Sequence, residues 1–157
     1  MPDLLLRPAR NDECDALTAL CLRSKAVHGY DETFMAACEA ELAVTPEKLS
    51  KGGHVVAEAG GFIVGFARVS EDEEGWWLDA LFIEPNRIGN GTGKVLFDAA
   101  MDLVRKAGAA SVLIDSDPGA EAFYLSRGAV RIGTSPSASI PGRVLSQLRY
   151  DLQASPP

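Results

Sequence analysis

The sequence is poor in basic residues, histidines and cysteines, and each shortage excludes a class of function. It holds 15 lysines and arginines against 22 acidic residues, which gives a formal net charge of −7. Nonspecific binding to nucleic acid or to an anionic membrane needs a basic surface, so we predict neither partner. The two histidines and three cysteines lack the spacing of a metal site, so we predict no metal ligand.

Long apolar runs are missing as well. The N-terminal segment has only three consecutive leucines, Leu4 to Leu6, which matches neither a signal peptide nor a membrane span. An odd number of cysteines without a Cys-x-x-Cys pair indicates buried thiols, and we expect a reducing, cytoplasmic location. With 157 residues, 46% of them hydrophobic, the chain fits one domain over residues 1–153, followed by a frayed tail at 154–157.

The sequence does contain a glycine-rich turn between a predicted strand and a predicted helix. An apolar strand begins at Leu78, and glycines then stand at alternate positions, Gly89, Gly91 and Gly93. Apolar residues next recur every three or four positions as far as Ala107, which predicts an amphipathic helix. Glycines let several backbone N–H groups face one point, and a helix N-terminus adds unpaired N–H groups and a positive dipole end. This pattern predicts a site for a phosphate-bearing ligand.

The spacing of this turn narrows the choice of ligand. A nucleotide P-loop needs a glycine five residues before the Gly-Lys pair and a Ser or Thr after it, but Ile88 and Val95 occupy these positions. A dinucleotide-binding fingerprint needs a third glycine where Lys94 stands. The sequence therefore disfavours both kinds of nucleotide site.

The glycine turn resembles the coenzyme A signature of the GCN5-related N-acetyltransferase (GNAT) superfamily, which reads Gln or Arg, two residues, Gly, one residue, and Gly or Ala. The matching positions are Ile88, Gly89, Asn90, Gly91, Thr92 and Gly93. Ile88 stands where the family usually has Gln or Arg, which removes a polar side chain. The resemblance implies that the backbone amides of this segment, with Lys94 beside it, hold the pyrophosphate of acetyl-CoA.

A second stretch strengthens the resemblance. Residues 116–124 (SDPGAEAFY), followed by Gly128, resemble the later motif of the superfamily, in which Asn or Asp opens a helix that carries an aromatic-Tyr pair. The resemblance implies that Asp117 lies beside the pantetheine arm and that Phe123 packs near the cofactor. It also implies that Tyr124 points its hydroxyl at the thioester sulfur.

The order of the predicted elements matches the same superfamily over nearly the whole chain. From the N-terminus it is strand, two helices, three strands, helix, strand, helix and two strands, with a short helical or irregular piece opened by Pro46. Gly60-Gly61 predicts a hairpin. We therefore predict a mixed α/β single-domain GNAT fold. It has a mostly antiparallel, twisted sheet of about seven strands, flanked by about four helices and splayed at the cofactor-binding strands.

Asp79 is the strongest candidate for a general base. An amine with a pKa of about 10.4 is almost fully protonated at neutral pH, so acetylation needs a carboxylate, acting directly or through water, to take up a proton. Asp79 is the single charge in the apolar strand from Trp76 to Ile83. An ion pair is the structural alternative, and Glu84 at the strand's end is a weaker candidate for the base.

Two further groups complete the predicted chemistry. Tyr124 is the natural proton donor, because a phenol stays protonated at neutral pH; an ordinary core tyrosine is the alternative. Polarisation of the thioester carbonyl is expected from a backbone N–H of the splayed strand, near Phe82 or Ile83.

The break between the first two predicted helices is the candidate acceptor site. Its polar residues are Ser24, Lys25, His28 and Tyr30. Half-buried loop residues are the alternative reading for His28 and Tyr30. Arg143, after the Ser-rich loop 134–142, is suited to bind an acceptor carboxylate, and a structural salt bridge is equally compatible with the sequence.

Together these features predict a cytoplasmic N-acetyltransferase that transfers the acetyl group of acetyl-CoA to a primary amine by direct attack in a ternary complex. The acceptor is a small molecule or a peptide. The alternative from another class is a non-catalytic acyl-CoA-binding or sensing module, and a weaker one is a nucleotide-binding domain. An exposed late strand such as 144–152 would allow a homodimer.

Overall fold

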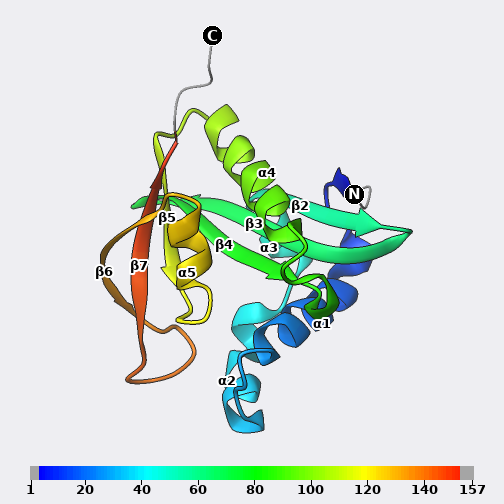
Figure 1. Cartoon of the computed structure of the whole chain (residues 1–157), viewed down its shortest axis with the longest axis horizontal. Helices are drawn as coiled ribbons and strands as arrows, with labels where there is room; N and C mark the ends of the chain where they lie inside the picture. The colour runs from blue at the N-terminus through cyan, green and yellow to red at the C-terminus, as the bar shows by residue number, and fades with distance from the viewer. Residues whose placement is uncertain (1–3, 153–157) are drawn as a thin grey trace.

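A seven-stranded sheet forms the centre of the part that the computed structural model describes, residues 4–152. The strands lie in the order β1-β2-β3-β4-β5-β7-β6, and all neighbours are antiparallel except β4 and β5. Their bounds are β1 Leu5–Arg7, β2 Gly52–Ala59, β3 Phe62–Asp72, β4 Gly75–Ile83, β5 Ser111–Ser116, β6 Val130–Pro136 and β7 Val144–Asp151. In Figure 1, β2, β3 and β4 cross the molecule at a steep angle to β5 and β7, so the sheet is strongly twisted.

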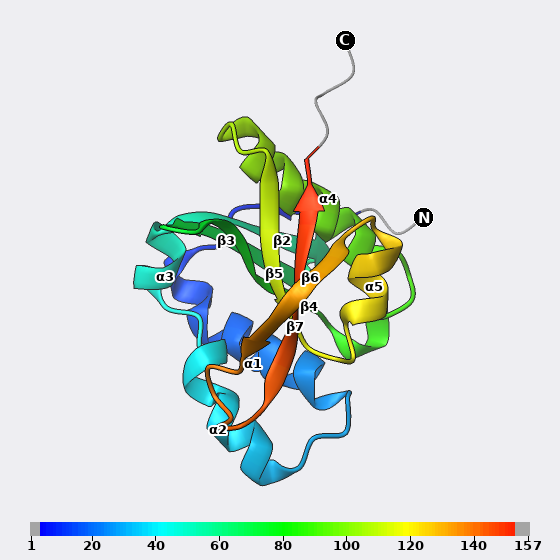
Figure 2. The same ribbon diagram turned by 90° about the vertical axis from the view of Figure 1, so that its left-hand side faces the viewer.

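Helices cover both faces of the sheet. The α-helices of the described part are α1 Cys14–Ala26, α2 Glu32–Leu42, α3 Pro46–Ser50, α4 Thr92–Lys106 and α5 Glu121–Ser126. Figures 1 and 2 show α4 on one face, and α1, α2 and α3 on the other. Two 3₁₀ turns, Asn11–Glu13 and Pro85–Arg87, precede α1 and α4. None of the helices within residues 4–152 is long and apolar enough to cross a membrane.

Each face of the sheet has its own apolar core. On β2, Val55 and Ala57 pack on the α4 side, whereas Val56 packs with α1 and α3 on the other side. The buried face of α4 is at most 1% exposed at Leu96, Phe97, Ala100, Met101 and Val104. Gly65 on β3 lets α4 approach closely, because a Cβ there would lie 2.4 Å from Leu96 Cδ1. The predicted amphipathic helix is therefore confirmed.

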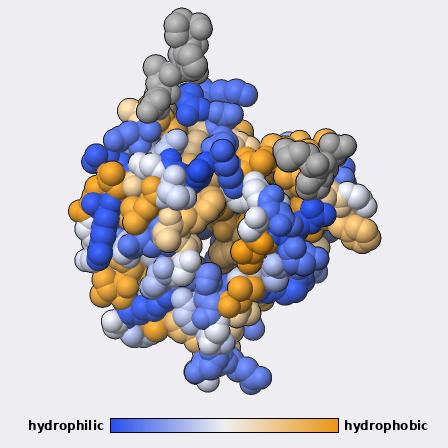
Figure 3. All heavy atoms as spheres, viewed as in Figure 1, coloured by the Kyte–Doolittle hydropathy of each residue, from blue (hydrophilic) through white to orange (hydrophobic). Residues whose placement is uncertain are grey.

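β4 and β5 separate after a short parallel pairing. Only Trp76 with Val112 and Trp77 with Leu113 are paired between them. Beyond these pairs the two strands are no longer paired with each other, although β4 continues to Ile83 and β5 to Ser116. The predicted splay is confirmed, and Figure 3 shows a hollow near the middle of the face seen in Figure 1. The separation leaves an opening between β4 and β5 that a ligand can enter.

The fold class and most local predictions are confirmed, with two corrections. A β2–β3 hairpin turns at Gly60 and Gly61, whose φ angles are 58° and 84°. The predicted strand 144–152 does not form a free edge: β7 is paired on one side with β5 and on the other with β6, because β6 folds back to the outside. The five α-helices of residues 4–152 agree with the predicted number of about four, and the short α3 is the helical or irregular piece expected at Pro46.

The second correction concerns α5, which begins at Glu121 rather than at Asp117. The carboxylate of Asp117 does not cap the helix, because it is used by residues of other elements. The predicted tail at 154–157 lies outside the described residues.

Candidate active site

The separated strands enclose a cavity of about 150 Å³. Its walls come from β4, β5, α1, α5 and the loop between β6 and β7. Among its lining residues are six of the predicted site residues: Ser24, His28, Asp79, Asp117, Tyr124 and Arg143. Phe82 of β4 also lines it, whereas Tyr30 reaches the site through Asp117. The structure thus brings the predicted catalytic and acceptor-binding residues to one place.

Tyr124 lies at the inner end of the cavity on α5. Its side chain is 7% exposed, and its ring lies 6.2 Å from that of Phe97 and 5.5 Å from that of Phe123, between centroids. Its hydroxyl makes no hydrogen bond to another residue of the described part. Burial raises the pKa of this phenol, and the negative charge of Asp117 adds to the effect. Tyr124 is therefore protonated at neutral pH, with a free O–H at the cavity.

Asp79 occupies an irregular position of β4. The register pairs Arg68 with Ala80 and Val69 with Leu78, so Asp79 is the extra residue of a β-bulge. Its carboxylate accepts a hydrogen bond from the hydroxyl of Ser70 and forms a 3.3 Å ion pair with Arg68. Both the cavity position and the ion-pair alternative are thus present, and the role of Asp79 as base stays a prediction.

The pKa of Asp79 is raised by burial, against the opposing effects of Ser70 and Arg68. A carboxylate with a raised pKa binds a proton more tightly, which suits a general base. Glu84 lacks these properties. Arg23 donates two 2.8 Å hydrogen bonds to it, the pKa of Glu84 is lowered by this partner, and its side chain is not part of the cavity wall.

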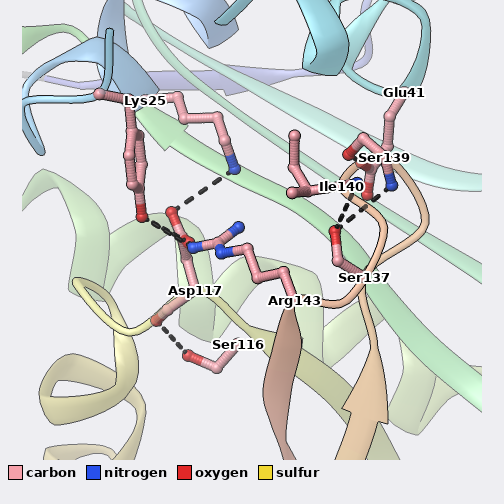
Figure 4. Close-up of polar contacts among 9 residues, drawn as sticks. Lys25, Glu41, Ser116, Asp117, Ser137, Ser139, Ile140 and Arg143 are labelled. Atoms are coloured by element: carbon pink, nitrogen blue, oxygen red, sulfur yellow. Dashed lines mark hydrogen bonds and ion pairs between the residues drawn. The ribbon is translucent and has the colours of Figure 1, made fainter. Parts of the chain in front are cut away.

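The carboxylate of Asp117 interacts with Lys25, Tyr30 and Arg143, and we call these four residues the Asp117 cluster. The Tyr30 hydroxyl donates to the carboxylate at 2.8 Å, Lys25 lies 3.5 Å away, and Arg143 forms an ion pair with it. In Figure 4, Lys25 and Arg143 converge on Asp117 from α1 and from the start of β7. Tyr30 also stacks on Phe34, with ring centroids 4.0 Å apart.

The electrostatics of the Asp117 cluster favour a charged carboxylate. Burial pushes the pKa of Asp117 upward, but Arg143, Lys25 and Tyr30 outweigh it and hold the pKa below its ordinary value. The salt bridge that was the alternative reading for Arg143 is therefore present. Asp117 lines the cavity, so the predicted neighbour of the pantetheine arm also holds Lys25, Tyr30 and Arg143 at this part of its wall.

His28 and Ser24 are both held by backbone groups. A Cβ at Gly119 would lie 2.4 Å from His28 Nδ1, so the imidazole rests against the loop between β5 and α5. The N–H of Ile83 donates a 3.2 Å hydrogen bond to the Ser24 hydroxyl, which is a contact that the sequence did not indicate. Ser24 therefore touches β4, the strand of the predicted carbonyl-polarising amide, in addition to lining the cavity.

The glycine turn has the geometry expected of an anion site. Gly89 and Gly91 have φ angles of 88° and 84°, and a Cβ at either would meet no atom within 4 Å. No side chain caps α4, and its first turn carries no acidic residue, so the N–H groups of this turn are available to an anion. Thr92 adds a buried hydroxyl without a hydrogen-bond partner. These features fit the pyrophosphate of coenzyme A.

The side chains around the glycine turn are compatible with a bound pyrophosphate. Asn90 and Lys94 are exposed, and Ile88 is 52% exposed, so an apolar residue stands at the surface of the cradle. Phe123 packs under it, because a Cβ at Gly93 would lie 3.4 Å from Phe123 Cε1. The predicted contact of Phe123 with the cofactor-binding segment is compatible with this position.

Several polar residues of the site were not predicted. Arg68 and Ser70 on β3 hold Asp79, and their two-residue spacing on one strand was the signal for a shared face. Glu41 of α2 and Ser139 of the β6–β7 loop line the cavity and are hydrogen-bonded to each other. Figure 4 shows the two side chains next to each other. This last contact joins distant segments, so no local pattern could have revealed it.

Comparison with known proteins agrees with the fold and the site. Residues 18–138 match the family model of the acetyltransferase (GNAT) domain. This is more than half of the chain, and the protein therefore belongs to the GNAT acetyltransferase family. No curated protein matches the chain.

Solved structures share the fold over nearly the whole length. A GCN5-related N-acetyltransferase from Rhodopseudomonas palustris has a TM-score of 0.79 and 25% identity, with 96% of each chain covered. The PaiA N-acetyltransferase from Thermoplasma acidophilum, solved with coenzyme A, has a TM-score of 0.77 and 15% identity over 96% of this chain and 99% of that one. An aminoglycoside 6′-N-acetyltransferase, also solved with coenzyme A, has a TM-score of 0.72 and 18% identity over 98% and 99%.

Proposed function

We propose that this protein transfers the acetyl group of acetyl-CoA to a primary amine, which attacks directly in a ternary complex. The observation that carries the proposal is the cavity between β4 and β5, where the free hydroxyl of Tyr124 and the carboxylate of Asp79 line one space. The anion-binding turn at the start of α4 supports coenzyme A as the carrier. Family membership and neighbours that bind coenzyme A support the same chemistry.

Acetyl-CoA supplies, when bound, an electrophilic thioester carbonyl and a thiolate leaving group. The residues of this chain take part in the proton transfers. Asp79 takes one proton from the incoming ammonium, directly or through water, and so makes the nitrogen nucleophilic. As the C–N bond forms and the C–S bond breaks, the nitrogen loses its second proton, and the sulfur gains one. Arg68 and Ser70 hold the Asp79 carboxylate in place during this exchange.

Tyr124 acts on the sulfur mainly through its hydrogen bond. An ordinary thiol has a pKa of about 8.5, and burial raises the pKa of Tyr124 above that of a free phenol. Complete transfer of the phenolic proton to a thiolate is therefore uphill, whereas donation of a hydrogen bond to the developing negative charge is favourable. We assign Tyr124 the stabilisation of the leaving group, with the net proton coming from solvent or the amine.

The acceptor is a small-molecule or peptide amine. Two structural neighbours are an aminoglycoside 6′-N-acetyltransferase and the ribosomal-protein-S18-alanine N-acetyltransferase from Escherichia coli, whose acceptors are an aminoglycoside and an alanine of that ribosomal protein. The cavity wall of this chain carries Glu41 and Asp115 as well as Asp79, while its two cations, Lys25 and Arg143, are paired with Asp117. This acidic lining favours a cationic acceptor by electrostatic attraction.

A thiol-release screen with a broad amine panel tests the proposal. We expect the wild type to release free thiol from acetyl-CoA with at least one amine, and Tyr124→Phe to release it at least about 10-fold more slowly. Tyr124→Phe removes one hydroxyl and keeps the ring that packs on Phe97, so its fold should be unchanged. Equal rates in both proteins would refute the role of Tyr124.

Calorimetry separates the proposal from its two alternatives. Tight binding of coenzyme A with no thiol release from any amine would favour a sensing module. Preference for ATP or NAD over coenzyme A would favour a nucleotide-binding domain and would contradict the assignment of the glycine turn.

A further inference from the structure

The contact between Ser24 and Ile83 places a side-chain hydroxyl at the open edge of β4. Ser24 lies in the last turn of α1, and its side chain is 8% exposed. The Ile83 N–H donates to its Oγ at 3.2 Å. Ser24 and its neighbour in the cavity wall, Phe82, belong to the same cavity as Tyr124. A nearly buried hydroxyl therefore stands between the backbone of β4 and the reaction space.

The register of β4 explains why this amide is available. The N–H of Glu84 donates to Val64 O at 2.8 Å, on the β3 side. N–H groups of successive residues point to opposite edges of a strand, so the Phe82 amide also faces β3, and the Ile83 amide faces the opening. Of the two amides predicted to polarise a carbonyl, Phe82 is committed to the sheet, and Ile83 is occupied by Ser24.

The Ser24 hydroxyl has an unused hydrogen-bond donor position. A serine hydroxyl has one donor and two acceptor positions, and the Ile83 N–H uses one acceptor position. Within residues 4–152, the Ser24 O–H donates to no other group. A hydroxyl that accepts a hydrogen bond becomes a stronger donor, because the two bonds polarise each other. Because Ser24 lines the cavity, this donor position is available to an oxygen that enters it.

We propose that Ser24 donates its O–H hydrogen bond to a carbonyl oxygen of bound acyl-CoA, and that the Ile83 amide acts through Ser24 instead of contacting the ligand itself. The inference rests on the proposed function, since it requires coenzyme A in the opening between β4 and β5. It assigns Ser24 to the acyl donor rather than to the acceptor amine. Bound acyl-CoA offers two kinds of carbonyl oxygen to this hydrogen bond: that of the thioester and those of the pantetheine amides.

Three variants test the proposal. Ser24→Ala removes the hydroxyl, Ser24→Cys keeps nearly the same volume with a weak donor, and Ser24→Thr restores a hydroxyl. Thermal unfolding checks that each is folded, and the Cys variant carries the test if the Ala variant is not. Each protein is titrated with coenzyme A by calorimetry, and infrared difference spectra are recorded with acetyl-CoA labelled with ¹³C at the thioester carbonyl.

The two carbonyl sources give different results. If the thioester oxygen accepts the bond, Ser24→Ala moves the ¹³C carbonyl band to higher wavenumber, lowers kcat about 10-fold or more, and leaves the Kd of coenzyme A within about 2-fold. If a pantetheine amide accepts it, the band stays in place and Kd rises about 2- to 10-fold. In both cases Ser24→Thr restores the wild-type value, and a merely structural role would not move the band or the Kd in this selective way.

Other outcomes overturn the proposal. Tighter binding of coenzyme A by Ser24→Ala would mean that Ser24 competes with the ligand for the Ile83 amide. Unchanged kcat, Kd and carbonyl band would mean that the hydroxyl does not touch the ligand. Failure of the proposed function is seen separately in the wild type, which would then either bind no coenzyme A or bind it without releasing thiol with any amine.

Discussion

The hydroxyl of Tyr30 donates a 2.8 Å hydrogen bond to the carboxylate of Asp117, which joins the segment after α1 to the segment after β5. Arg143, at the start of β7, forms an ion pair with the same carboxylate. Three segments that are distant in sequence therefore meet at one charged group in the cavity wall. The position of this wall depends on Asp117 more than on any single partner.

Asp117→Asn should lower the free energy of unfolding by about 2 kcal/mol, because it leaves Lys25 and Arg143 close together without their counter-charge. Tyr30→Phe removes one hydrogen bond and should cost only about 1 kcal/mol. Urea unfolding at pH 7 measures both values. A change below about 0.5 kcal/mol for Asp117→Asn would show that the two cations find other partners.

Acid should weaken the N-terminal part of the fold through Glu13. Arg7 donates hydrogen bonds of 2.9 and 2.7 Å to this carboxylate, and the pKa of Glu13 is lowered to about 2, by Arg7 above all and against the effect of burial. The stabilisation is therefore complete above the ordinary pKa of 4.5 and is lost as the pH falls from there to about 2.

The Arg7 and Glu13 side chains are 12% and 14% exposed, so solvent screens the pair only in part, and we expect the lost stability to be about 1–2 kcal/mol. Unfolding curves between pH 6 and pH 2 should show a smaller pH dependence in Glu13→Gln than in the wild type. Glu47→Gln, which alters an exposed pair with Lys51, is the matched control. Parallel curves for Glu13→Gln and the wild type would contradict the assignment.

Local patterns in the sequence were sufficient for the scaffold and for part of the site. The alternate glycines from Gly89 and the periodicity of α4 predicted the anion-binding turn, and the motif ending at Tyr124 predicted a hydroxyl at the cavity. Contacts between elements that are distant in sequence could not be predicted from local patterns. The bulge that aims Asp79 at Ser70 arises from the register of two strands, and the bond between Ser24 and Ile83 depends on how α1 crosses β4.

The same distinction explains the two wrong expectations. The strand 144–152 has no sequence feature that distinguishes an inner position from an edge, because its neighbour β6 returns to the outside of the sheet. Asp117 has the residue type of a helix cap, but two cations and a phenol from other elements attract its carboxylate more strongly than the first turn of α5 does.

The pH dependence of catalysis should report Asp79. Because burial raises its pKa above the ordinary value of 3.8, kcat/KM should fall on the acid side at a pH above 3.8. Arg68→Gln removes a cation that favours the carboxylate, so the pKa of Asp79 should rise further, and the acid limb should move to higher pH.

The pH profiles of kcat/KM for the wild type, Arg68→Gln and Asp79→Asn check this prediction. Asp79→Asn should lose the acid limb along with about 10²-fold or more of the activity. Arg149→Gln, whose pair with Asp151 lies outside the cavity wall, should keep the wild-type profile. An acid limb that stays in place in Arg68→Gln would exclude Asp79 as the titrating base.

Gly119→Ala should disturb acceptor binding through His28. Gly119 has no positive φ that would disfavour alanine, so the effect comes from contact: the new Cβ would lie 2.4 Å from His28 Nδ1 and 2.6 Å from Cε1. The imidazole must therefore move away from the loop between β5 and α5 and change the cavity wall. We expect the KM for the amine to rise about 3- to 10-fold, which corresponds to about 1 kcal/mol.

The Kd of coenzyme A should stay unchanged in this variant, because the glycine turn at Gly89 and Gly91 does not contact His28. Gly133→Ala is the matched control, since a Cβ there meets no atom within 4 Å and its φ is not positive. The double variant Gly119→Ala with His28→Ala removes the clash. If the amine KM of the double variant equals that of His28→Ala alone, the effect of Gly119→Ala acts through the imidazole; a further rise in KM would place it in the loop backbone instead.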